Sequence, residues 1–265
     1  MGEIDDPEVR VLHRYIANRE HVLEILKTGR IRYSKPEEFN DPFDCDIDIA
    51  HAVTWRQYVG AMRDEGRRKR KDTAEIQKRI EEETSRHRRT VPPEYVERVR
   101  SGVAEVKDSL RSQGILSLSA ICDSIPMSSY YADRHSGACI GFRRSPDNAL
   151  GSSATRKVSY TDDFPNVSYY DMFENPGHLS VTVLSTKSRA WEHEQEWRVI
   201  VTKGGVFHDV PVEIDCVLFG LRTDDAFKIK VVEAIAEEKS IALRQAFKTP
   251  RQFRIGFTDY RQTPA

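Results

Sequence analysis

The pattern of apolar and polar positions predicts short strands and a short helix at the start of the chain. Strands are expected at residues 9–15 and 30–34, where apolar side chains recur at strand spacing. Between them a helix is expected, because Asn18 can accept the first free N–H groups and Gly29 can end the helix in a left-handed conformation.

The second half of the chain is predicted to be mainly sheet. Short apolar runs bounded by turn residues indicate strands at 114–119, 137–142, 156–160, 198–202, 216–220, 241–247 and 252–257. One helix is expected at 224–239, with an apolar stripe of helical period that packs on the sheet. Helices and strands in this mixture predict an α+β fold.

Residues 41–48 also alternate, with Phe43, Cys45 and Ile47 set against three aspartates, which predicts a strand with one polar face. The spacing of Asp44, Asp46 and Asp48 suggests a calcium loop. An EF-hand loop needs glycine at its sixth position and glutamate at its twelfth, but this chain has isoleucine and tryptophan there. A calcium loop is therefore rejected.

Residues 53–111 are highly charged and poor in apolar residues, which predicts a helical insertion within a single domain of residues 1–265. Val91-Pro92-Pro93 breaks the helical pattern. Arg67–Lys71 is a basic run that suits phosphate contacts, but acidic residues follow at 81–83. A solvated helix face is the favoured interpretation of the run, and a phosphate-binding surface is the alternative.

Composition narrows the class of protein. The 265 residues include 38% apolar residues, enough for a sizeable core, and the 41 basic and 42 acidic residues nearly cancel. The net charge therefore gives no argument for nucleic acid or an anionic membrane. No run of about 18 apolar residues predicts a membrane span, and the acidic N-terminus is unlike a signal peptide, so a cytoplasmic protein is expected.

Metal and disulfide chemistry find little support. Cys45, Cys122, Cys139 and Cys216 lie far apart and without a Cys-x-x-Cys motif, which favours buried reduced thiols. The eight histidines are scattered, so no metal site is expected. Nucleotide-binding glycine loops, the His-Glu-x-x-His zinc motif and the Gly-x-Ser-x-Gly nucleophile motif are also missing.

Glu192, Glu194 and Glu196 stand two residues apart where the sequence turns into a strand. If the strand extends back over them, all three carboxylates share one face. Crowded carboxylates raise one another's pKa, and a carboxylate that donates a proton or stabilises a cation cleaves glycosidic bonds. The alternative is a solvated strand edge whose charges prevent aggregation.

Motifs spread over most of the chain resemble those of an uncharacterised, largely bacterial protein family of unknown function. They are Leu-His-Arg-Tyr at 12–15, Ser-Lys-Pro-Glu-Glu-Phe-Asn-Asp-Pro-Phe-Asp at 34–44, Ser-Leu-Ser at 117–119, Tyr-Ala-Asp-Arg-His-Ser-Gly at 131–137 within 127–142, and Glu-Gln-Glu-Trp-Arg at 194–198. Two departures stand out, since residues 127–130 lack the family's usual tryptophan and the segment at 53–111 is longer than expected.

At longer range this family is similar to ADP-ribosyltransferases. The resemblance implies an α+β domain of two small, mainly antiparallel sheets with a cleft between them, plus the helical insertion. It also implies NAD as the substrate, with no metal. Breaking the bond between nicotinamide and ribose passes through an oxocarbenium-like state, which a carboxylate near the sugar stabilises.

The resemblance assigns roles to the late acidic motif. Glu196 matches the catalytic glutamate of the Glu-x-Glu motif, and Glu194 matches the position that orients the acceptor. Arg198 continues the same strand face, where it is expected to pair with the carboxylates and to belong to the NAD-binding residues.

The first strand supplies the next candidates. Arg14 matches the position that holds a phosphate or ribose of NAD, but a shift of one residue would put His13 there instead. Only one of the two is expected to face the cleft. Tyr15, beside them, is a further candidate for contact with NAD, although a core aromatic is the simpler interpretation.

The remaining candidates lie in the middle of the chain. Ser117 and Ser119, on one strand face, correspond to the serine-bearing strand whose hydroxyls fix the dinucleotide. Tyr130 or Tyr131 suits stacking on nicotinamide. The simpler interpretations are that Ser119 ends a strand and that the tyrosines fill the core. His135 suits a helix-end cap and a cleft residue equally.

The sequence thus predicts an enzyme that transfers ADP-ribose from NAD to a protein or nucleic acid, or that hydrolyses NAD. The resemblance adds a possible role as a bacterial toxin or phage-defence effector, restrained by an inhibitory partner protein. One alternative is a binding module without catalysis that contacts nucleic acid or protein through Arg67–Lys71. A second is a nuclease that binds magnesium through Asp44, Asp46 and Asp48 or through the three glutamates.

Overall fold

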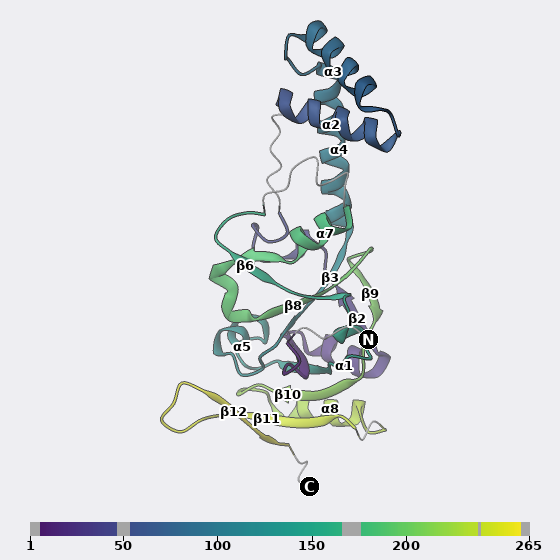
Figure 1. The fold of residues 1–265 in the computed structure, drawn as a ribbon. Helices are drawn as coiled ribbons and strands as arrows, with labels where there is room; N and C mark the ends of the chain where they lie inside the picture. Colours follow the sequence, from purple (N-terminus) through teal and green to yellow (C-terminus); the bar gives the residue numbers. More distant parts are fainter. Residues whose placement is uncertain (1–5, 47–53, 166–175, 238–239, 261–265) are drawn as a thin grey trace. The chain divides into compact units, whose positions relative to one another are not determined.

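The computed structural model describes residues 6–46, 54–165, 176–237 and 240–260 (Figure 1). The chain divides into two compact units. The first combines Met1–Asp44, Ser112–Asp162 and Ser185–Ala265, and the second combines Cys45–Arg111 and Asp163–Leu184. The helices and sheets of the described residues confirm the α+β class.

An eight-stranded sheet forms the first unit, in the order β12-β11-β10-β4-β1-β3-β8-β5 (Figure 1). Its strands are β1 (Val11–Ile16), β3 (Gly114–Ser119), β4 (Ala138–Arg143), β5 (Thr155–Lys157), β8 (Glu196–Val201), β10 (Ile214–Phe219), β11 (Ala242–Lys248) and β12 (Ile255–Asp259). Neighbouring strands are antiparallel except β10 and β11, which are parallel.

Two smaller sheets complete this unit. β2 (Arg30–Tyr33) pairs with β9 (Val206–Asp209), and β6 (Ser159–Thr161) pairs with β7 (Thr186–Ser188). The expectation of two small sheets was therefore wrong in detail, because β1 joins the β4 side and the β3 side into one large sheet.

The link between these two sides is narrow. β1 and β4 are aligned at six residue pairs, whereas β1 and β3 are aligned at the single pair His13–Ser119. Beyond that pair the backbones of β1 and β3 no longer form a ladder. The sheet is thus continuous but weakly paired at its middle.

A core of apolar side chains covers one face of the sheet. Its central members, from five strands of the large sheet, are Leu12, Leu116, Ile140, Phe142, Trp197 and Val217. Two helices contribute to the same cluster, α1 (Arg19–Thr28) through Val22 and Leu23, and α8 (Asp225–Ala234) through Phe227 and Val231. Burial of this apolar area at about 25 cal/mol per Å² is the main force that holds the helices on the sheet.

The first helix begins and ends as predicted. The Asn18 side chain accepts hydrogen bonds from the backbone N–H groups of Glu20 and His21, and Gly29 ends the helix at φ 64°. Asp224, which pairs with Arg19 of α1, caps α8. That helix ends at Ala234, earlier than the predicted residue 239.

The predicted strands are confirmed with small shifts at their ends, but two expectations were wrong. The strand predicted at 156–160 is two strands, β5 and β6, separated at Val158, whose N–H donates to the Glu196 carbonyl. Residues 41–46 form a turn, because the Asp41 side chain accepts the Phe43 N–H and Cys45 has a positive φ of 60°. Asp48 lies outside the described residues.

The second unit is helical. It contains α2 (Trp55–Arg68), α3 (Thr73–His87), most of α4 (Pro93–Ser112), and α7 (Pro176–Leu184). Thr54 and Asp72 cap the first two of these helices. The Pro-Pro break predicted at 91–93 falls where α4 begins, since proline is tolerated in a first helical turn.

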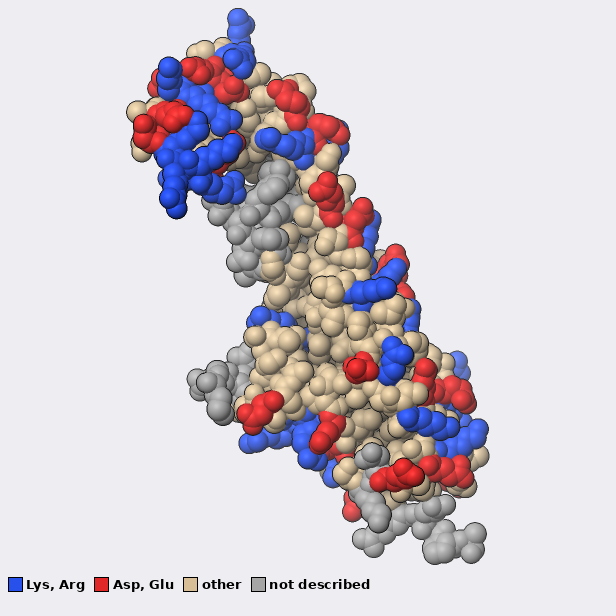
Figure 2. All heavy atoms as spheres, turned by 90° about the vertical axis from the view of Figure 1, so that its right-hand side faces the viewer, with Lys and Arg blue, Asp and Glu red and all other residues tan. Residues whose placement is uncertain are grey.

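The basic run at residues 67–71 has acidic neighbours. Lys69 Nζ lies 2.7 Å from a Glu65 carboxylate oxygen, and Lys71 pairs with Glu75. Arg67 lies 3.8 Å from Asp64. On the face in Figure 2, red acidic and blue basic side chains are interspersed over the helical unit. The structure therefore agrees with a solvated, salt-bridged helix surface.

The remaining short elements of the chain are α5 (Ile125–Tyr131) and three 3-10 helices, η1 (Pro36–Glu38), η2 (Ala149–Gly151) and η3 (Arg189–Glu194). The four cysteines are free thiols, with Cys139 and Cys216 buried. Among the described residues no helix combines the length and the apolar character needed to cross a membrane.

The backbone at the start of β4 leaves no room for a side chain. A Cβ atom on Gly137 would lie 2.3 Å from the carbonyl oxygen of Ile16. We expect Gly137→Ala to lower the free energy of unfolding by about 1–3 kcal/mol, because the backbone must shift. Gly60→Ala is the control: nothing lies within 4 Å of its added Cβ, and alanine in helix α2 should stabilise by about 0.5–1 kcal/mol. Urea unfolding curves that move in the same direction for both variants would contradict this.

Candidate functional site

A cavity of about 450 Å³ opens beside the single point where β1 meets β3. Most of the sequence-predicted site residues line it, although they come from four distant segments of the chain. They are His13, Arg14 and Tyr15 from β1, Ser117 and Ser119 from β3, Tyr130 and Tyr131 from α5, and Glu194 and Glu196 from the late acidic motif. The splaying of two neighbouring strands thus gathers residues that the sequence keeps apart.

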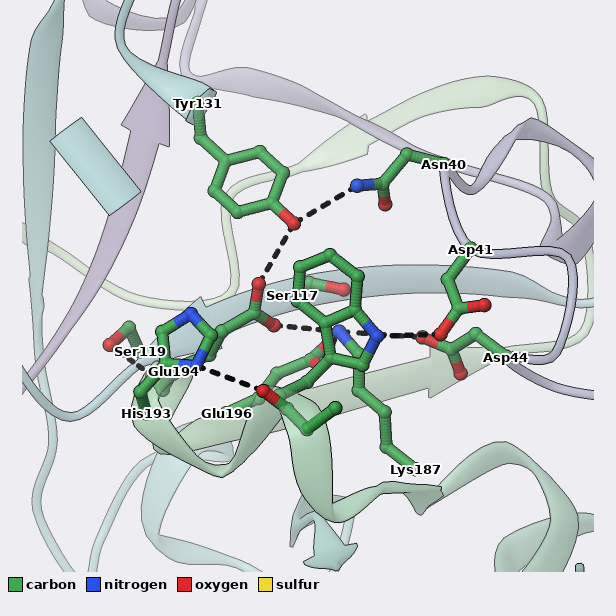
Figure 3. A network of polar contacts seen from close by, with 12 residues as sticks. Asn40, Asp41, Asp44, Ser117, Ser119, Tyr131, Lys187, His193, Glu194 and Glu196 are labelled. Carbon is green, nitrogen blue, oxygen red and sulfur yellow. Dashed lines mark hydrogen bonds and ion pairs between the residues drawn. The ribbon is translucent and has the colours of Figure 1, made fainter. Parts of the chain in front are cut away.

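A buried lysine joins the acidic groups of the cavity wall (Figure 3). Lys187 Nζ lies 2.6 Å from Glu194 Oε2 and 3.0 Å from Glu196 Oε2. The same ammonium lies 3.5 Å from Asp44 Oδ2. Three carboxylates therefore share one cation, which β7 places between them.

Arg198 holds two of these carboxylates in place. Its guanidinium donates to both oxygens of Asp44 at 2.9 and 2.6 Å, and to both oxygens of Glu196 at 2.8 and 3.0 Å. The predicted pairing of Arg198 with the carboxylates is thus present. Arg198 is fully buried and does not line the cavity, so it supports Glu196 rather than contacting a ligand.

The charged neighbours fix the ionisation of Glu196. Burial alone would raise the pKa of its carboxyl group, but the charges and hydrogen bonds of Arg198 and Lys187, with a hydrogen bond from Ser117, outweigh burial and lower the pKa to about 2. Burial would also lower the pKa of Lys187, and the three carboxylates raise it instead. Near neutral pH Glu196 is therefore an ionised carboxylate held by two cations.

The expected strand face of three glutamates was wrong. Residues 189–194 form the 3-10 helix η3, and Gln195 follows it in a left-handed conformation at φ 45°. Strand β8 begins only at Glu196, so Glu192 is exposed while Glu194 is buried. Glu194 and Glu196 meet at Lys187 because the chain turns at Gln195, not because a strand alternates.

Glu194 is held on both of its oxygens. Tyr131 donates its hydroxyl hydrogen to Glu194 Oε1 at 2.8 Å, and Lys187 binds Oε2. Burial, then the charge and hydrogen bond of Glu194, raise the pKa of Tyr131 to about 12. Tyr131 thus stays a hydrogen-bond donor over the physiological range.

The segment Asn40–Asp44 covers this network from one side (Figure 3). Asn40 donates to the Tyr131 hydroxyl at 3.2 Å, and Trp191 donates its indole N–H to Asp41 at 2.7 Å. Asp44 binds Arg198, as described above. The motif at 40–44 is therefore a turn that supplies three polar anchors, and its carboxylates are not a strand face.

Arg14 presents its guanidinium to the cavity. One nitrogen donates to the Ser117 carbonyl at 2.8 Å, and within the described part of the chain its other N–H groups have no acceptor. Burial lowers the pKa of Arg14, opposed by the charge of Glu196. A guanidinium with spare donors at a cavity suits an anionic or hydroxyl-bearing ligand.

His13 is also among the residues that line the cavity. The ring bonds the Ser119 backbone, and its Nδ1 atom has no partner in the described structure. Burial lowers the pKa of His13 to about 4. His13 is therefore neutral near pH 7 and differs chemically from the permanently charged Arg14.

The hydroxyl groups of three other candidates already form hydrogen bonds within the protein. Ser119 is buried and donates to the Glu194 carbonyl at 2.7 Å. Tyr15 donates to the Ile121 carbonyl at 3.1 Å. Ser117 hydrogen-bonds the Glu196 carboxylate. Ser119 and Tyr15 thus agree with the structural alternatives, and Ser117 lies beside the Glu196 carboxylate.

His135 lies away from this cavity. Asp133, Arg134 and His135 all have positive φ angles, so they form the tight turn between α5 and β4. The His135 ring lies 3.1 Å from the Ser129 hydroxyl and lines a separate, smaller cavity. His135 therefore belongs to the turn at the end of helix α5, and it does not line the main cavity. Tyr130, by contrast, is 67% exposed at the main cavity.

Sequence reasoning missed the central cation. Lys187 stands between small polar residues, and no local feature separates it from the other lysines. Asp44 was recognised within a motif but assigned to a strand. A signal existed there, because Asn40-Asp41-Pro42 is a turn sequence that argues against a strand.

Metal binding finds no cluster in the described residues. No group of three or more histidine, cysteine, aspartate or glutamate side chains in these ranges is arranged to hold an ion. Lys187 and Arg198 already neutralise Asp44, Glu194 and Glu196.

Comparison with known proteins bears on the part of the chain that carries half of this site. Residues 127–199 match the model of a protein family of unknown function, DUF2971. This confirms the resemblance to an uncharacterised family. The matched segment holds Tyr131, Lys187, Glu194, Glu196 and Arg198, whereas β1, β3 and the turn at 40–44 lie outside it.

The other comparisons found no match. Neither the curated proteins nor the solved structures contain a protein that matches this chain.

The buried His13 predicts a specific loss of stability in acid. Because its folded pKa of about 4 lies below the ordinary 6.5, the unfolded chain binds more protons between these values. Neutral His13 makes its full contribution to the free energy of unfolding above pH 6.5. That contribution falls by up to about 3 kcal/mol as the pH drops to about 4. We expect His13→Gln to remove this slope in urea unfolding measured from pH 7 to 4, while the exposed His193→Gln keeps it. An unchanged slope in His13→Gln would contradict the assignment.

The pairing of Asp44 with Arg198 predicts a large and local effect. Asp44→Ala leaves a buried guanidinium with half of its partners, and we expect the free energy of unfolding to fall by about 3–5 kcal/mol. Asp147→Ala, at an exposed carboxylate in the loop after β4, should change it by less than about 0.5 kcal/mol. Equal melting temperatures for the two variants would show that the pair contributes little.

Proposed function

We propose that this protein is an NAD-dependent ADP-ribosyltransferase, or an NAD glycohydrolase, with an ADP-ribosyltransferase-like fold. The observation that carries the proposal is the cavity between β1 and β3. It brings Arg14, Ser117, Tyr131, Glu194 and Glu196 together, which are the positions that the family resemblance assigns to NAD.

Glu196 suits stabilisation of an oxocarbenium-like state. The reaction needs a carboxylate that is ionised and fixed before the positive charge develops on the ribose. A pKa near 2 keeps Glu196 ionised, and Arg198, behind the cavity wall, and Lys187, within it, fix its two oxygens. The carboxylate thus needs no reorganisation when the substrate ionises.

Ser117 explains how a sugar would enter this arrangement. A carboxylate accepts about four hydrogen bonds, and Glu196 receives two from Arg198, one from Lys187 and one from Ser117. Of these donors, the Ser117 hydroxyl is the weakest and can rotate. A ribose hydroxyl would replace it, so the Ser117 hydroxyl marks the position that we assign to the substrate hydroxyl.

Glu194 and Tyr131 would orient the acceptor. Glu194 is tied to Lys187 through one oxygen and to Tyr131 through the other, so the Tyr131 hydroxyl and the Glu194 carboxylate form one unit at the cavity. In transfer the acceptor is a protein or nucleic-acid group, and in hydrolysis it is water. A carboxylate at this position can accept the proton that the acceptor loses.

Arg14 and Tyr130 would bind the remainder of the substrate. The spare N–H groups of Arg14 suit a phosphate or ribose oxygen, and the exposed ring of Tyr130 suits stacking on a flat base. A substrate that is drawn from the cell's NAD pool fits a cytoplasmic protein. A role as a toxin or phage-defence effector with an inhibitory partner would follow from such an activity.

NAD turnover tests the proposal directly. We expect the purified protein to release nicotinamide from NAD labelled on the adenine side, with label passing to an acceptor or to free ADP-ribose. Glu196→Gln should lower the rate by about 10²–10³-fold, because the charge that stabilises the transition state is lost. Glu192 is an exposed glutamate four residues earlier in the same acidic motif. Glu192→Gln should therefore retain the full rate.

A second variant separates chemistry from folding. Glu196→Gln weakens a buried ion-pair cluster, so its melting temperature must be measured beside its rate. Tyr130→Ala alters only an exposed ring and should raise KM for NAD with little change in melting temperature. A folded Glu196→Gln protein with the wild-type rate would overturn the proposal, as would wild-type protein that neither binds nor consumes NAD at about 1 mM.

A further inference from the structure

The hairpin between β11 and β12 ends in a basic, aromatic tip. Residues 248–254 read Lys-Thr-Pro-Arg-Gln-Phe-Arg, with three cations and no acidic residue. All of these residues are exposed except Thr249, which is partly buried. In Figure 1 the tip projects away from the rest of the sheet. This tip plays no part in the cavity described above.

The tip has a defined shape. The Thr249 N–H donates to the Arg254 carbonyl at 3.0 Å, and the Gln252 N–H donates to the Thr249 carbonyl at 3.2 Å. Pro250 fixes the backbone at the first corner of this turn. Arg251, at the second corner, has a positive φ of 62°, where glycine is the usual residue. The turn therefore holds the Arg251 backbone in one defined conformation at the tip.

Two phenylalanines are displayed on the same hairpin. Phe253 is 103% exposed and Phe247 is 42% exposed. Gly256 lies opposite Phe247 in the ladder, and a Cβ there would come within 2.5 Å of the Phe247 ring. Glycine thus lets the Phe247 ring lie close across the hairpin. Neither ring belongs to the described apolar core clusters, so burial does not explain the two aromatic residues.

The cations of the tip are not neutralised by the protein. Among the described residues, Lys248, Arg251 and Arg254 form no ion pair, and the nearest acidic contact on the hairpin joins Arg244 to Asp259 at 3.8 Å. The basic run at 67–71 is different, since Lys69 and Lys71 have glutamate partners. The hairpin is therefore the better match for a polyanion, although it carries fewer charges.

We propose that the β11–β12 tip binds single-stranded nucleic acid, with Arg251, Arg254 and Lys248 on the phosphates and Phe253 stacked on a base. Basic side chains beside an exposed aromatic ring are the combination that such strands require, and unpaired bases offer their faces for stacking. Arginine adds a planar fork for phosphate oxygens. An anionic membrane would also attract the cations, but stable anchoring takes more apolar area than one projecting ring.

This proposal goes beyond the reaction in the cavity and does not depend on it. The full-length protein is titrated into a fluorescein-labelled oligonucleotide of about 20 thymidines, and fluorescence anisotropy gives Kd at several salt concentrations. We expect Phe253→Ala to weaken binding about tenfold or more, because a stacked base is lost, and Phe253→Trp to restore it. Replacing Arg251 and Arg254 by glutamine should make the plot of log association constant against log salt concentration less steep, by about 1.4 in slope.

Matched variants show whether the effect belongs to the tip. Phe43→Ala removes another phenylalanine, 65% exposed, and should leave Kd unchanged. Neutralising residues 67–71 with glutamine should also leave it unchanged. The proposal is overturned if the wild-type protein does not bind the oligonucleotide in low salt, if residues 67–71 carry the binding, or if only vesicles of anionic phospholipid are bound. Because NAD is absent from this assay, its result is separate from the test of the cavity.

Discussion

The buried cluster around Arg198 is the interaction on which the site depends. Each ion that is transferred from water into the protein interior loses several kcal/mol of hydration free energy. A buried cluster of ions is therefore stable only when every charge has a partner. Arg198 meets this condition through Asp44 and Glu196, and Lys187 meets it through Glu194 and Glu196. Removing one member leaves another charge without compensation. The turn at 40–44, the 3-10 helix and β8 are thus fixed together by charge.

The sheet supplies the space in front of this cluster. β1 is bound to β4 along its whole length but to β3 at one aligned pair, His13–Ser119. A fully paired β1 and β3 would fill the gap with ladder hydrogen bonds and close the cavity. The Ser119 hydroxyl and the His13 ring both serve this junction, Ser119 by bonding the Glu194 carbonyl and His13 by bonding the Ser119 backbone. The same contact therefore keeps the sheet continuous and leaves the cavity open.

Local patterns predicted most of the elements, because strand alternation and helix caps depend on neighbouring residues. The same logic failed at Glu192–Glu196, where a left-handed Gln195 and a 3-10 helix replace the strand. Nothing in the sequence marks that turn. Lys187 could not be found either, because its role arises only when β7 places it beside three carboxylates from other segments. The glutamate spacing and the resemblance to a family located the acidic motif and predicted Arg198 as its partner, whereas the fold alone revealed Lys187.

The distribution of charge across the cavity gives the strongest argument for the kind of ligand. Lys187 and Arg198 are committed to carboxylates in the wall, whereas Arg14 faces the cavity with N–H groups that no described residue accepts. A ligand suited to both sides brings an anion or a hydroxyl oxygen to Arg14 and a hydroxyl donor that can replace Ser117 at Glu196. A simple sugar lacks the anion, and a simple phosphate lacks the hydroxyls. A nucleotide carries both at neighbouring positions, so the charge pattern agrees with the NAD that we propose as the substrate.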